Sequence, residues 1–343
     1  MRKLALINFC IVILLFTFKP VKSYGIENNK IKKFAVLFYQ QNNAYNYALK
    51  DELMKIQENN KDKVEFIFYD GEFNQETQNK QLEEVVKNKI DVVLLNIVDI
   101  NSSKDIVEKV KENNIPIIFF DIEPSSFDYL KSYGKSLYVG ADNCNLGIDQ
   151  GKMIINQYKN KSIIDRNNNN ILDYVLLKGN INDIDSIYRS KCVIEAINNS
   201  GLKTRELYSG YFNWSKETTK EIIKPILLQV IDNADVIISN NDDMAIGAIE
   251  TLQDYGYNLG HNNRYIPVVG INALDEAKKL IENGFMEGTL EQSPKVMAEA
   301  LYKVGLNMSE HKNPLQDTNY IFDSSGVAIR IPPVETITRK IKS

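Results

Sequence analysis

The sequence predicts an α/β protein with two lobes, each built on a parallel sheet. Short apolar runs rich in β-branched and aromatic residues alternate with helix-period segments almost to the end of the chain. A strand, a crossover helix and a further strand indicate parallel sheets buried on both faces. The 343 residues are enough for two such sheets. No Pro/Ser-rich linker separates the halves, so we expect crossing segments, rather than a tether, to join the lobes.

The first 23 residues have the pattern of a secretory signal peptide. Arg2 and Lys3 precede a 15-residue apolar run, residues 4–18, and residues 21–23 offer a cleavage site with a small residue. The run is short for a membrane span. We expect residues 1–23 to be cleaved, with an uncleaved anchor as the alternative. The protein would then be exported and be periplasmic, extracellular or on the cell surface.

Charge and cysteine content narrow the function further. Without the four basic residues of the leader, 37 basic side chains face 45 acidic ones, a net charge of −8. An acidic exported protein is a poor candidate for binding nucleic acid, which requires clustered Lys and Arg. Residues 24–343 contain only Cys144 and Cys192. A disulfide between them is possible in an exported chain, but we expect two unpaired cysteines.

The elements follow one another in a regular order. The predicted strands are 34–39, 64–69, 92–95, 115–120, 174–177, 236–239, 266–271 and 285–290. Amphipathic helices are expected at 75–87, 103–112, 186–199, 216–231 and 273–282. Ligands of open parallel sheets bind beyond the carboxyl ends of the strands. The residues after each strand are therefore the candidates for a binding site.

Planar amides, carboxylates and aromatic rings recur at these strand ends. The set is Asn42, Asn43, Tyr45, Asn96, Asp99, Asp121, Glu123, Asp183, Asp185, Asn240, Asn241, Asp242, Asn272, Glu291 and Gln292, with the single Trp214 after another short run. Such groups suit a hydroxyl-rich, uncharged small molecule, best a pyranose sugar. A single Asn after a strand is more often a helix cap, but the recurrence over many strands favours a binding site for the set.

The segment from residue 165 to residue 189 carries two further signals. Positions 1, 3, 5, 7 and 9 of a calcium loop correspond to Asp165, Asn167, Asn169, the Ile171 carbonyl and Asp173. The twelfth position is apolar, so either another segment supplies the bidentate carboxylate or the loop is an Asn-rich turn without metal. Asp185 and Arg189 lie four apart on one helix face. They form either a surface ion pair or a polar clamp at a pocket.

An enzyme or a repressor is disfavoured. The two histidines, His261 and His311, lie in polar, loop-like contexts, and no GxSxG, HExxH, Walker A or GxGxxG motif occurs. Carboxylates at the strand ends would allow a glycosidase pair, but beside Arg189 they suit ligand acceptors. A sugar-responsive repressor needs an N-terminal helix-turn-helix, where this chain has the predicted signal peptide.

Several motifs resemble the exported galactose/glucose-binding proteins of bacterial ABC transporters and chemotaxis, which are periplasmic binding proteins of type 1. The similarity covers about residues 33–333. It rests on NIVD (96–99), FFDIEP (119–124), YVG (138–140), VLLKG (175–179), SNNDDMA (239–245), PVVGINA (267–273) and RIP (330–332).

The resemblance implies two Rossmann-like lobes joined by a three-segment hinge, with a monosaccharide between them. We expect the N-terminal lobe to contain 33–115 and 293–330, and the C-terminal lobe 116–292 and 331–343. The implied sugar contacts are Asn43, Tyr45, Asn96, Asp183, Asp185, Arg189, Trp214, Asn241, Asn272 and Gln292. Tyr45 and Trp214 would sandwich the ring. The implied structural Ca²⁺ would bind Asp165, Asn167, Asn169, Ile171, Asp173 and, as the distant bidentate ligand, Asp235. A chelator should then lower the melting temperature.

The chain departs from the family pattern at several of these positions. The family usually has Asp where this chain has Asn43 and Asn272, and His, Phe and Asn where it has Asp183, Tyr45 and Gln292. Asp235 replaces a Glu. A mismatched polar group costs about 1–3 kcal/mol, so these changes preserve, weaken or redirect glucose binding.

The resemblance also implies partners and a mode of action. We expect a monomer that closes around its sugar and presents it to an ABC permease, and that serves a chemoreceptor or sensor kinase as well. The alternative is a protein of the same fold for a different sugar, a pentose or a modified hexose, that acts as a sensor partner.

Overall fold

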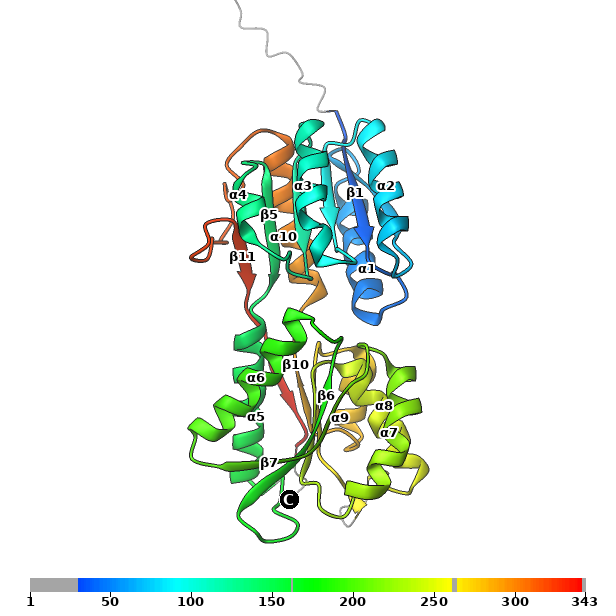
Figure 1. Cartoon of the computed structure of the whole chain (residues 1–343), viewed down its shortest axis with the longest axis vertical. Helices are drawn as coiled ribbons and strands as arrows, with labels where there is room; N and C mark the ends of the chain where they lie inside the picture. The colour runs from blue at the N-terminus through cyan, green and yellow to red at the C-terminus, as the bar shows by residue number, and fades with distance from the viewer. Residues whose placement is uncertain (1–29, 162, 261–263, 341–343) are drawn as a thin grey trace, which may run out of the picture.

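The computed structural model describes residues 30–161, 163–260 and 264–340, and the predicted leader lies outside these residues. The described part forms two lobes stacked along the long axis of the molecule (Figure 1). Each lobe is built on a six-stranded sheet. The two sheets confirm the predicted fold class, but the sequence predicts only eight of their twelve strands. None of the described helices combines the length and apolarity that a membrane crossing requires.

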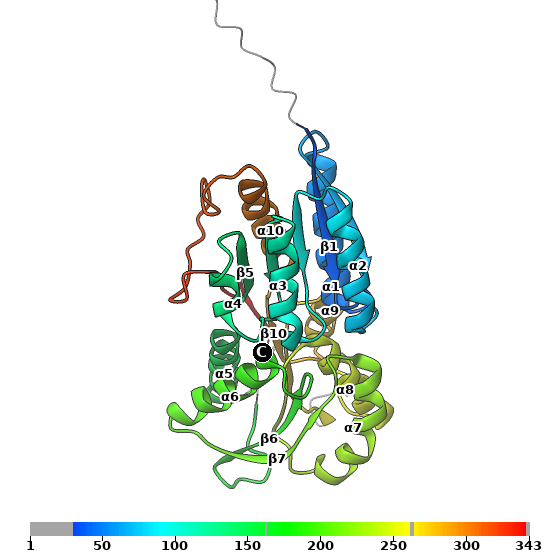
Figure 2. The same ribbon diagram turned by 45° about the horizontal axis from the view of Figure 1, so that its top comes forward.

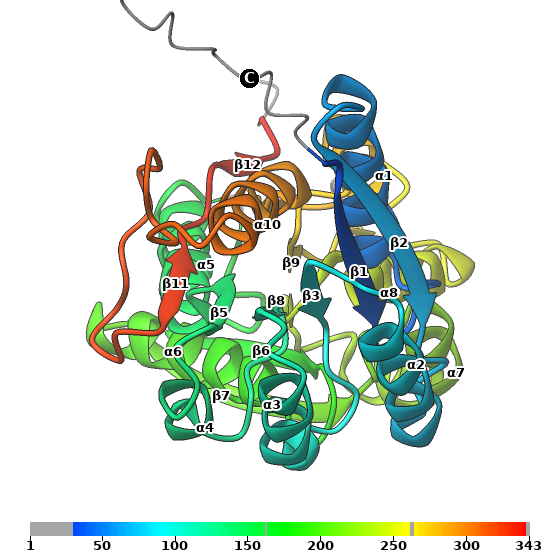
Figure 3. The ribbon, with the colours of Figure 1, turned by 90° about the horizontal axis from the view of Figure 1, so that it is seen from above.

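The first lobe contains a fully parallel sheet. In spatial order its strands are β11 (Ala328–Ile331), β5 (Ser136–Ala141), β4 (Ile117–Phe120), β3 (Val92–Leu95), β1 (Lys32–Phe38) and β2 (Val64–Asp70). The helices α1 (Ala44–Asn59) and α10 (Pro294–Ser309) cover one face, and α2 (Gln75–Lys87), α3 (Ser103–Glu112) and α4 (Phe127–Lys131) cover the other (Figure 3). A short 3₁₀ turn, η1 (Ile100–Ser102), precedes α3.

The alternation along β1 explains why both faces are covered. Phe34 and Phe38 belong to the core under α1 and α10, whereas Ala35 and Leu37 belong to the core under α2 and α3. All four are fully buried. A strand that is apolar at successive positions needs a helical layer on each side. Because both faces of the sheet are covered, a ligand can bind only at the edge where the carboxyl ends of the strands lie.

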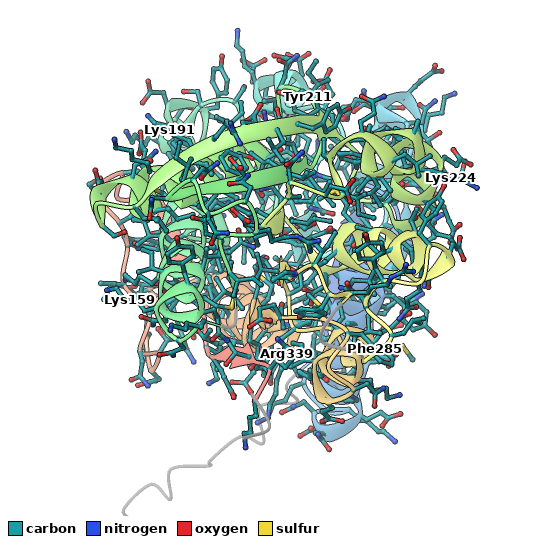
Figure 4. All side chains as sticks on the ribbon, turned by 90° about the horizontal axis from the view of Figure 1, so that it is seen from below. Lys159, Lys191, Tyr211, Lys224, Phe285 and Arg339 are labelled. Atoms are coloured by element: carbon teal, nitrogen blue, oxygen red, sulfur yellow. A yellow bond between two sulfur atoms is a disulfide. The ribbon has the colours of Figure 1, made fainter. Side chains whose placement is uncertain are left out.

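The second lobe repeats the plan with one reversed strand. Its sheet order is β12 (Thr336–Thr338), β10 (Gly288–Leu290), β9 (Val268–Ile271), β8 (Val236–Ser239), β6 (Ile171–Lys178) and β7 (Lys203–Tyr211). Among the described strands of this sheet, only β12 pairs antiparallel. The helices α5 (Asn143–Lys159) and α6 (Ile184–Asn199) cover one face, and α7 (Lys216–Val230), α8 (Asp242–Asp254) and α9 (Asp275–Glu282) cover the other. Seen from its outer end, the lobe carries Lys159, Lys191 and Lys224 around its rim (Figure 4).

Within the described residues the chain crosses between the lobes three times. The crossings follow β5, β10 and β11, near residues 141, 292 and 331. In the tilted view of Figure 2, α10 and β5 lie in the upper lobe and α5 and α6 in the lower.

The first crossing lies later than we expected. The expected boundary at residue 116 is wrong, because β4 pairs with β3, and β5 pairs with β4 and β11, all in the first sheet. The reason is that a run buried on both faces looks the same in either sheet, so the apolar pattern carries no information on its partner. The second crossing, at about residue 292, and the third, at about residue 331, agree with the expected bounds.

The expectation of unpaired cysteines is also wrong. Cys144 at the start of α5 and Cys192 in α6 form a disulfide, with their Cα atoms 5.3 Å apart. The packing of α5 against α6 brings the two residues together across 48 positions of sequence. Sequence spacing alone does not predict that proximity.

Candidate functional site

The carboxyl ends of the parallel strands of both lobes border a common cleft. At its base lies an inner pocket with a volume of about 50 Å³. It is continuous with an outer cleft of about 940 Å³, since Tyr39, Asn43, Asp183 and Trp214 line both. A pocket between two lobes, at the ends of their strands, is where open α/β sheets bind ligands.

The structure brings nine of the ten sequence-predicted sugar contacts to the inner pocket. They are Asn43, Tyr45, Asp183, Asp185, Arg189, Trp214, Asn241, Asn272 and Gln292. The tenth, Asn96, does not line it and is fully buried. Its Oδ1 accepts from the Tyr39 backbone N–H at 3.5 Å and its Nδ2 donates to the Phe120 carbonyl at 3.2 Å. Asn96 therefore ties together the ends of β1 and β4 and supports the pocket from below.

Three of these nine residues are also helix caps. Asn43 Oδ1 accepts from the backbone N–H of Tyr45 at 3.0 Å and begins α1. Asp183 and Asn241 cap α6 and α8 in the same way. The helix-cap and binding-site interpretations of such residues are thus compatible. Capping fixes the side chain, and the partially positive helix N-terminus then faces the pocket.

Arg189 holds the pocket together from the second lobe. Its Nε donates to Asn143 Oδ1 at 2.8 Å, its Nη1 to the Asn240 carbonyl at 2.9 Å, and its Nη2 to Gln292 Oε1 at 2.8 Å. Both Arg189 and Asp185 are buried, so the surface ion-pair interpretation is wrong. Asp185 instead accepts from Asn143 Nδ2 at 2.6 Å. Asn143 therefore fixes both members of the polar clamp that the sequence offered as the alternative.

Burial dominates the protonation equilibria of the pocket carboxylates. It raises the pKa of Asp185 well above its usual range, with a further increase from Asp183 and an opposing effect of Arg189. Burial also raises the pKa of Asp121 to about 6, again against the pull of Arg189. Carboxyl groups in a cleft whose pKa is raised by burial are typical of a functional site.

Trp214 lies flat against a glycine. A Cβ on Gly179 would lie 2.0 Å from the indole Cε2, so only glycine permits this packing. The indole Nε1 donates to Asp183 Oδ2 at 2.8 Å, and the Trp214 carbonyl accepts from Asn241 Nδ2 at 3.2 Å. These contacts hold the ring at the pocket wall. The sandwich of a sugar ring between Tyr45 and Trp214 stays a prediction.

Four lining residues of the inner pocket were not among the predicted contacts. They are Tyr39, Asp121, Ile122 and Asn180. Asp121 follows β4 directly and is one of the strand-end candidates, although it is not among the sugar contacts that the resemblance implies. Its carboxylate accepts from Gln292 Nε2 at 3.4 Å and so connects the first lobe to the second crossing.

The pocket wall also contains an unusual share of left-handed backbone. Positive φ angles occur at Asp121 (62°), Asn182 (61°), Asn213 (54°), Trp214 (57°) and Asn272 (126°), all of which border the inner pocket or the outer cleft. Asn and Asp tolerate such angles, whereas a bulky residue such as Trp214 adopts one only when surrounding contacts enforce it. The cleft is therefore built for recognition at some conformational cost.

The predicted calcium loop closes on itself through Asx-type contacts. Asp165 accepts from the backbone N–H groups of Asn169 and Asn170 at 3.1 and 2.7 Å. Asn169 Oδ1 accepts from the Ile171 N–H at 2.7 Å, and Asn167 Oδ1 from the Asn169 N–H at 3.2 Å. These contacts build an Asn-rich turn.

At the far side of this loop, Arg205 binds both oxygens of the Asp173 carboxylate. Its Nε and Nη2 donate to the two oxygens of Asp173 at 2.7 and 2.6 Å, and Asn167 Nδ2 also donates to Asp173 at 2.7 Å. Burial raises the pKa of Asp173, but the hydrogen bonds from Arg205, Asn167 and Asn169 and the charge of Arg205 together outweigh it, so the pKa is lowered overall. Asp235 accepts from two backbone N–H groups at 2.8 Å. As arranged, these groups do not fit a calcium ion. Binding would require Arg205 to leave and the amides to turn, so calcium here stays a prediction.

Comparison with known proteins identifies the family. The periplasmic binding protein domain matches residues 34–313. The chain is 30% identical to the D-galactose/methyl-galactoside binding periplasmic protein of Haemophilus influenzae, over 79% of each chain. It is 26% identical to the galactofuranose-binding protein of Escherichia coli, over 75% of this chain and 78% of that one.

A solved structure with the same fold agrees. The solute-binding protein of an ABC transporter from Actinobacillus succinogenes, bound to D-allose, superposes with a TM-score of 0.74 at 20% identity, covering 90% of this chain and 98% of that one. The two stacked lobes, the interlobe pocket and these matches agree with one another. The chain belongs to the type 1 periplasmic binding proteins that serve sugar ABC transporters.

Proposed function

We propose that this protein is an exported monosaccharide-binding protein of the galactose/glucose type that delivers its ligand to an ABC permease. The observation that carries the proposal is the convergence of nine predicted contacts on one interlobe pocket. The name of the Haemophilus relative, which specifies D-galactose and methyl-galactoside, supports this sugar class. The clamp residues Asp185 and Arg189 support it too, because they match the family pattern.

The pocket supports binding rather than catalysis. Among the described residues, those that line the inner pocket include no His, Cys or Lys, and His311 lies exposed in the turn after α10. Its carboxylates face an arginine and several amides, an arrangement that suits ligand hydroxyls. Incubation with chromogenic glycosides should release no product. Steady turnover at a rate that depends on Asp185 would overturn this part of the proposal.

Closure of the lobes would link binding to delivery. Gln292, at the second crossing, contacts both Arg189 of one lobe and Asp121 of the other, so the hinge itself lies at the pocket. On the cleft side, the Ala44 N–H of the first lobe donates to Asp243 of the second. A ligand that bridges the lobes stabilises the closed form, and a permease or chemoreceptor would recognise that form.

Calorimetry of the purified protein with galactose, glucose, arabinose and xylose tests the proposal. We expect a hexose to bind, and the Arg189→Met variant to lose at least tenfold in affinity. Lys191→Met, an exposed cation two positions further along α6, is the matched control and should bind normally. Binding of none of the sugars would refute the proposal.

A different sugar is the second candidate. Asn43, Asn272, Asp183, Tyr45 and Gln292 all line the pocket, and each departs from the usual family residue. In that case a pentose or a modified hexose would bind in place of galactose or glucose, and the protein would act as a sensor partner.

A further inference from the structure

Asn143 is a buried polar side chain that supports the pocket from outside it. It is not among the described residues that line the inner pocket, yet it contacts two that are. Its Oδ1 accepts from Arg189 Nε at 2.8 Å, and its Nδ2 donates to Asp185 Oδ1 at 2.6 Å. A primary amide carries an acceptor and two donors in one plane, so it can serve both partners at once. Its loss would leave both buried groups without these bonds, which is costly.

Asn143 also lies at the first crossing between the lobes. The strand β5 ends at Ala141, and Asn143 is the first residue of α5. Arg189, which it contacts, bonds in turn to Gln292 beside the second crossing at 2.8 Å. The clamp of Asp185 and Arg189 is therefore joined to the hinge. Its geometry depends on how the start of α5 sits on α6.

A disulfide fixes the start of α5 on α6, which lie side by side in Figures 1 and 2. It joins Cys144 to Cys192, whose Cα atoms are 5.3 Å apart. Cys144 directly follows Asn143 on α5. Cys192 lies about one helical turn after Arg189 on α6. The helices approach closely beside the bridge, since a Cβ on Gly147 would lie 2.7 Å from the Arg189 carbonyl oxygen. Asn143 thus has little freedom to shift relative to Arg189.

We propose that Asn143 is a positioning residue for sugar binding and that the disulfide holds it in place, so that the affinity for sugar depends on the bridge. This inference rests on the monosaccharide function proposed above and adds a condition to it. With the bridge formed, the clamp is ordered before the sugar arrives, and less freedom is lost on binding. Without it, α5 can shift on α6, and fewer molecules hold the clamp correctly. The apparent affinity falls by the same fraction.

Reduction of the bridge removes this constraint without a change of sequence. Cys192 is buried, but Cys144 is only partly buried and gives a reagent access. A dithiol such as dithiothreitol attacks one sulfur as a thiolate and breaks the S–S bond. Two electrons and two protons turn the bridge into two thiols, and the reagent is oxidised to its cyclic disulfide.

Calorimetry of the oxidised and the reduced protein without residues 1–23 tests the inference. The probe is the sugar that binds most tightly among galactose, glucose, arabinose and xylose. We expect reduction to lower its affinity about tenfold, while Trp214 fluorescence shows that the second lobe is still folded. An unchanged affinity, with two thiols found by titration after reduction, overturns this inference and leaves the monosaccharide function intact. If the oxidised protein binds none of the sugars, both proposals fail.

Variants of Asn143 test whether the bridge acts through this residue. Asn143→Leu keeps a similar volume and removes the donor and the acceptor, so the oxidised variant should bind about tenfold more weakly than the wild type. Reduction should then have little further effect, because no amide is left to position. Asn156→Leu, at an exposed position further along α5, is the matched control and should bind and respond as the wild type does.

Two results with these variants contradict the inference. One is wild-type affinity of oxidised Asn143→Leu. The other is a loss on reduction as large in Asn143→Leu as in the wild type, since the bridge would then act on the pocket without Asn143. Asn143→Ala provides the same comparison if Asn143→Leu does not fold. The oxidised variants still decide the role of Asn143 if the reduced protein unfolds.

Discussion

The disulfide between α5 and α6 should contribute strongly to the stability of the second lobe. We propose to replace both cysteines, as Cys144→Ala with Cys192→Ala, so that no free thiol remains. The bridge closes a segment with a sequence separation of 48 residues. For a loop of that length, the chain-entropy account gives a stabilisation of about 4 kcal/mol at 25 °C.

This free energy predicts a measurable shift. With a urea dependence of about 2–3 kcal/mol per molar, a loss of about 4 kcal/mol lowers the unfolding midpoint by about 1.3–2 M. Trp214 is the only tryptophan and lies in the second lobe, so its fluorescence reports on the lobe that contains the bridge. Far-UV circular dichroism reports on the helices and strands of both lobes together, so a transition that it shows without a change in Trp214 fluorescence belongs to the first lobe, since two lobes need not unfold as one unit.

The wild-type protein without and with reductant provides the control. Thiol titration of the unfolded wild-type protein without residues 1–23, which contain Cys10, should find no free cysteine before reduction. If the titration shows that the bridge is intact in the wild type, and the double variant still unfolds at the same urea concentration as the wild type, the entropic reasoning is refuted. If the titration finds two free thiols, the sequence-based expectation of unpaired cysteines is correct and the structure is wrong at this point.

Three further predictions follow from the packing and charge described above. Gly179→Ala should displace Trp214 and weaken sugar binding at least tenfold, measured by calorimetry, whereas Gly134→Ala, where a Cβ meets nothing within 4 Å, should bind as the wild type does. Asp242, whose pKa burial raises to about 7, binds its proton more tightly when folded than when unfolded. Its contribution to the free energy of unfolding is therefore full below about pH 4 and lost as the pH rises to about 7, and Asp242→Asn should flatten that dependence in urea titrations. Arg205→Met should increase the rise in melting temperature that calcium causes, because it frees the carboxylate that a calcium ion would need; equal responses of variant and wild type would contradict the competition between guanidinium and metal.

Some elements were predictable because their sequence pattern has a single explanation. The predicted bounds of α2 and α3 coincide with those of the structure. Both helices are half exposed, so polar and apolar residues alternate with the helical period. The edge strand β7 was missed for the opposite reason, because its sequence from Lys203 to Tyr211 is largely polar and lacks the apolar run of a central strand.

The position of the pocket was predictable, and its internal contacts were not. Residues that follow strands must meet at one edge of a parallel sheet, which is why Asp185, Asn241 and Asn272 come together. Whether such a residue faces the ligand or supports the pocket depends on side-chain packing. Asn96 and Asp121 show the two outcomes. Asn96, an implied sugar contact, lies beneath the pocket, whereas Asp121, a strand-end candidate that is not an implied sugar contact, lines it. The partner of a buried strand and the pairing of two cysteines depend in the same way on contacts distant in sequence.

The return of the chain to the first lobe has a consequence for its synthesis. The edge strand β11 and the helix α10 come from residues after 292, yet they complete the sheet and core that β1 begins near residue 32. A nascent chain that ends before α10 exposes Phe34, because the close approach of Gly305 to that ring is missing. The N-terminal lobe therefore cannot mature on the ribosome ahead of its neighbour. Nearly the whole polypeptide must be synthesised before the first lobe can be completed. The chain therefore stays incompletely folded throughout translation.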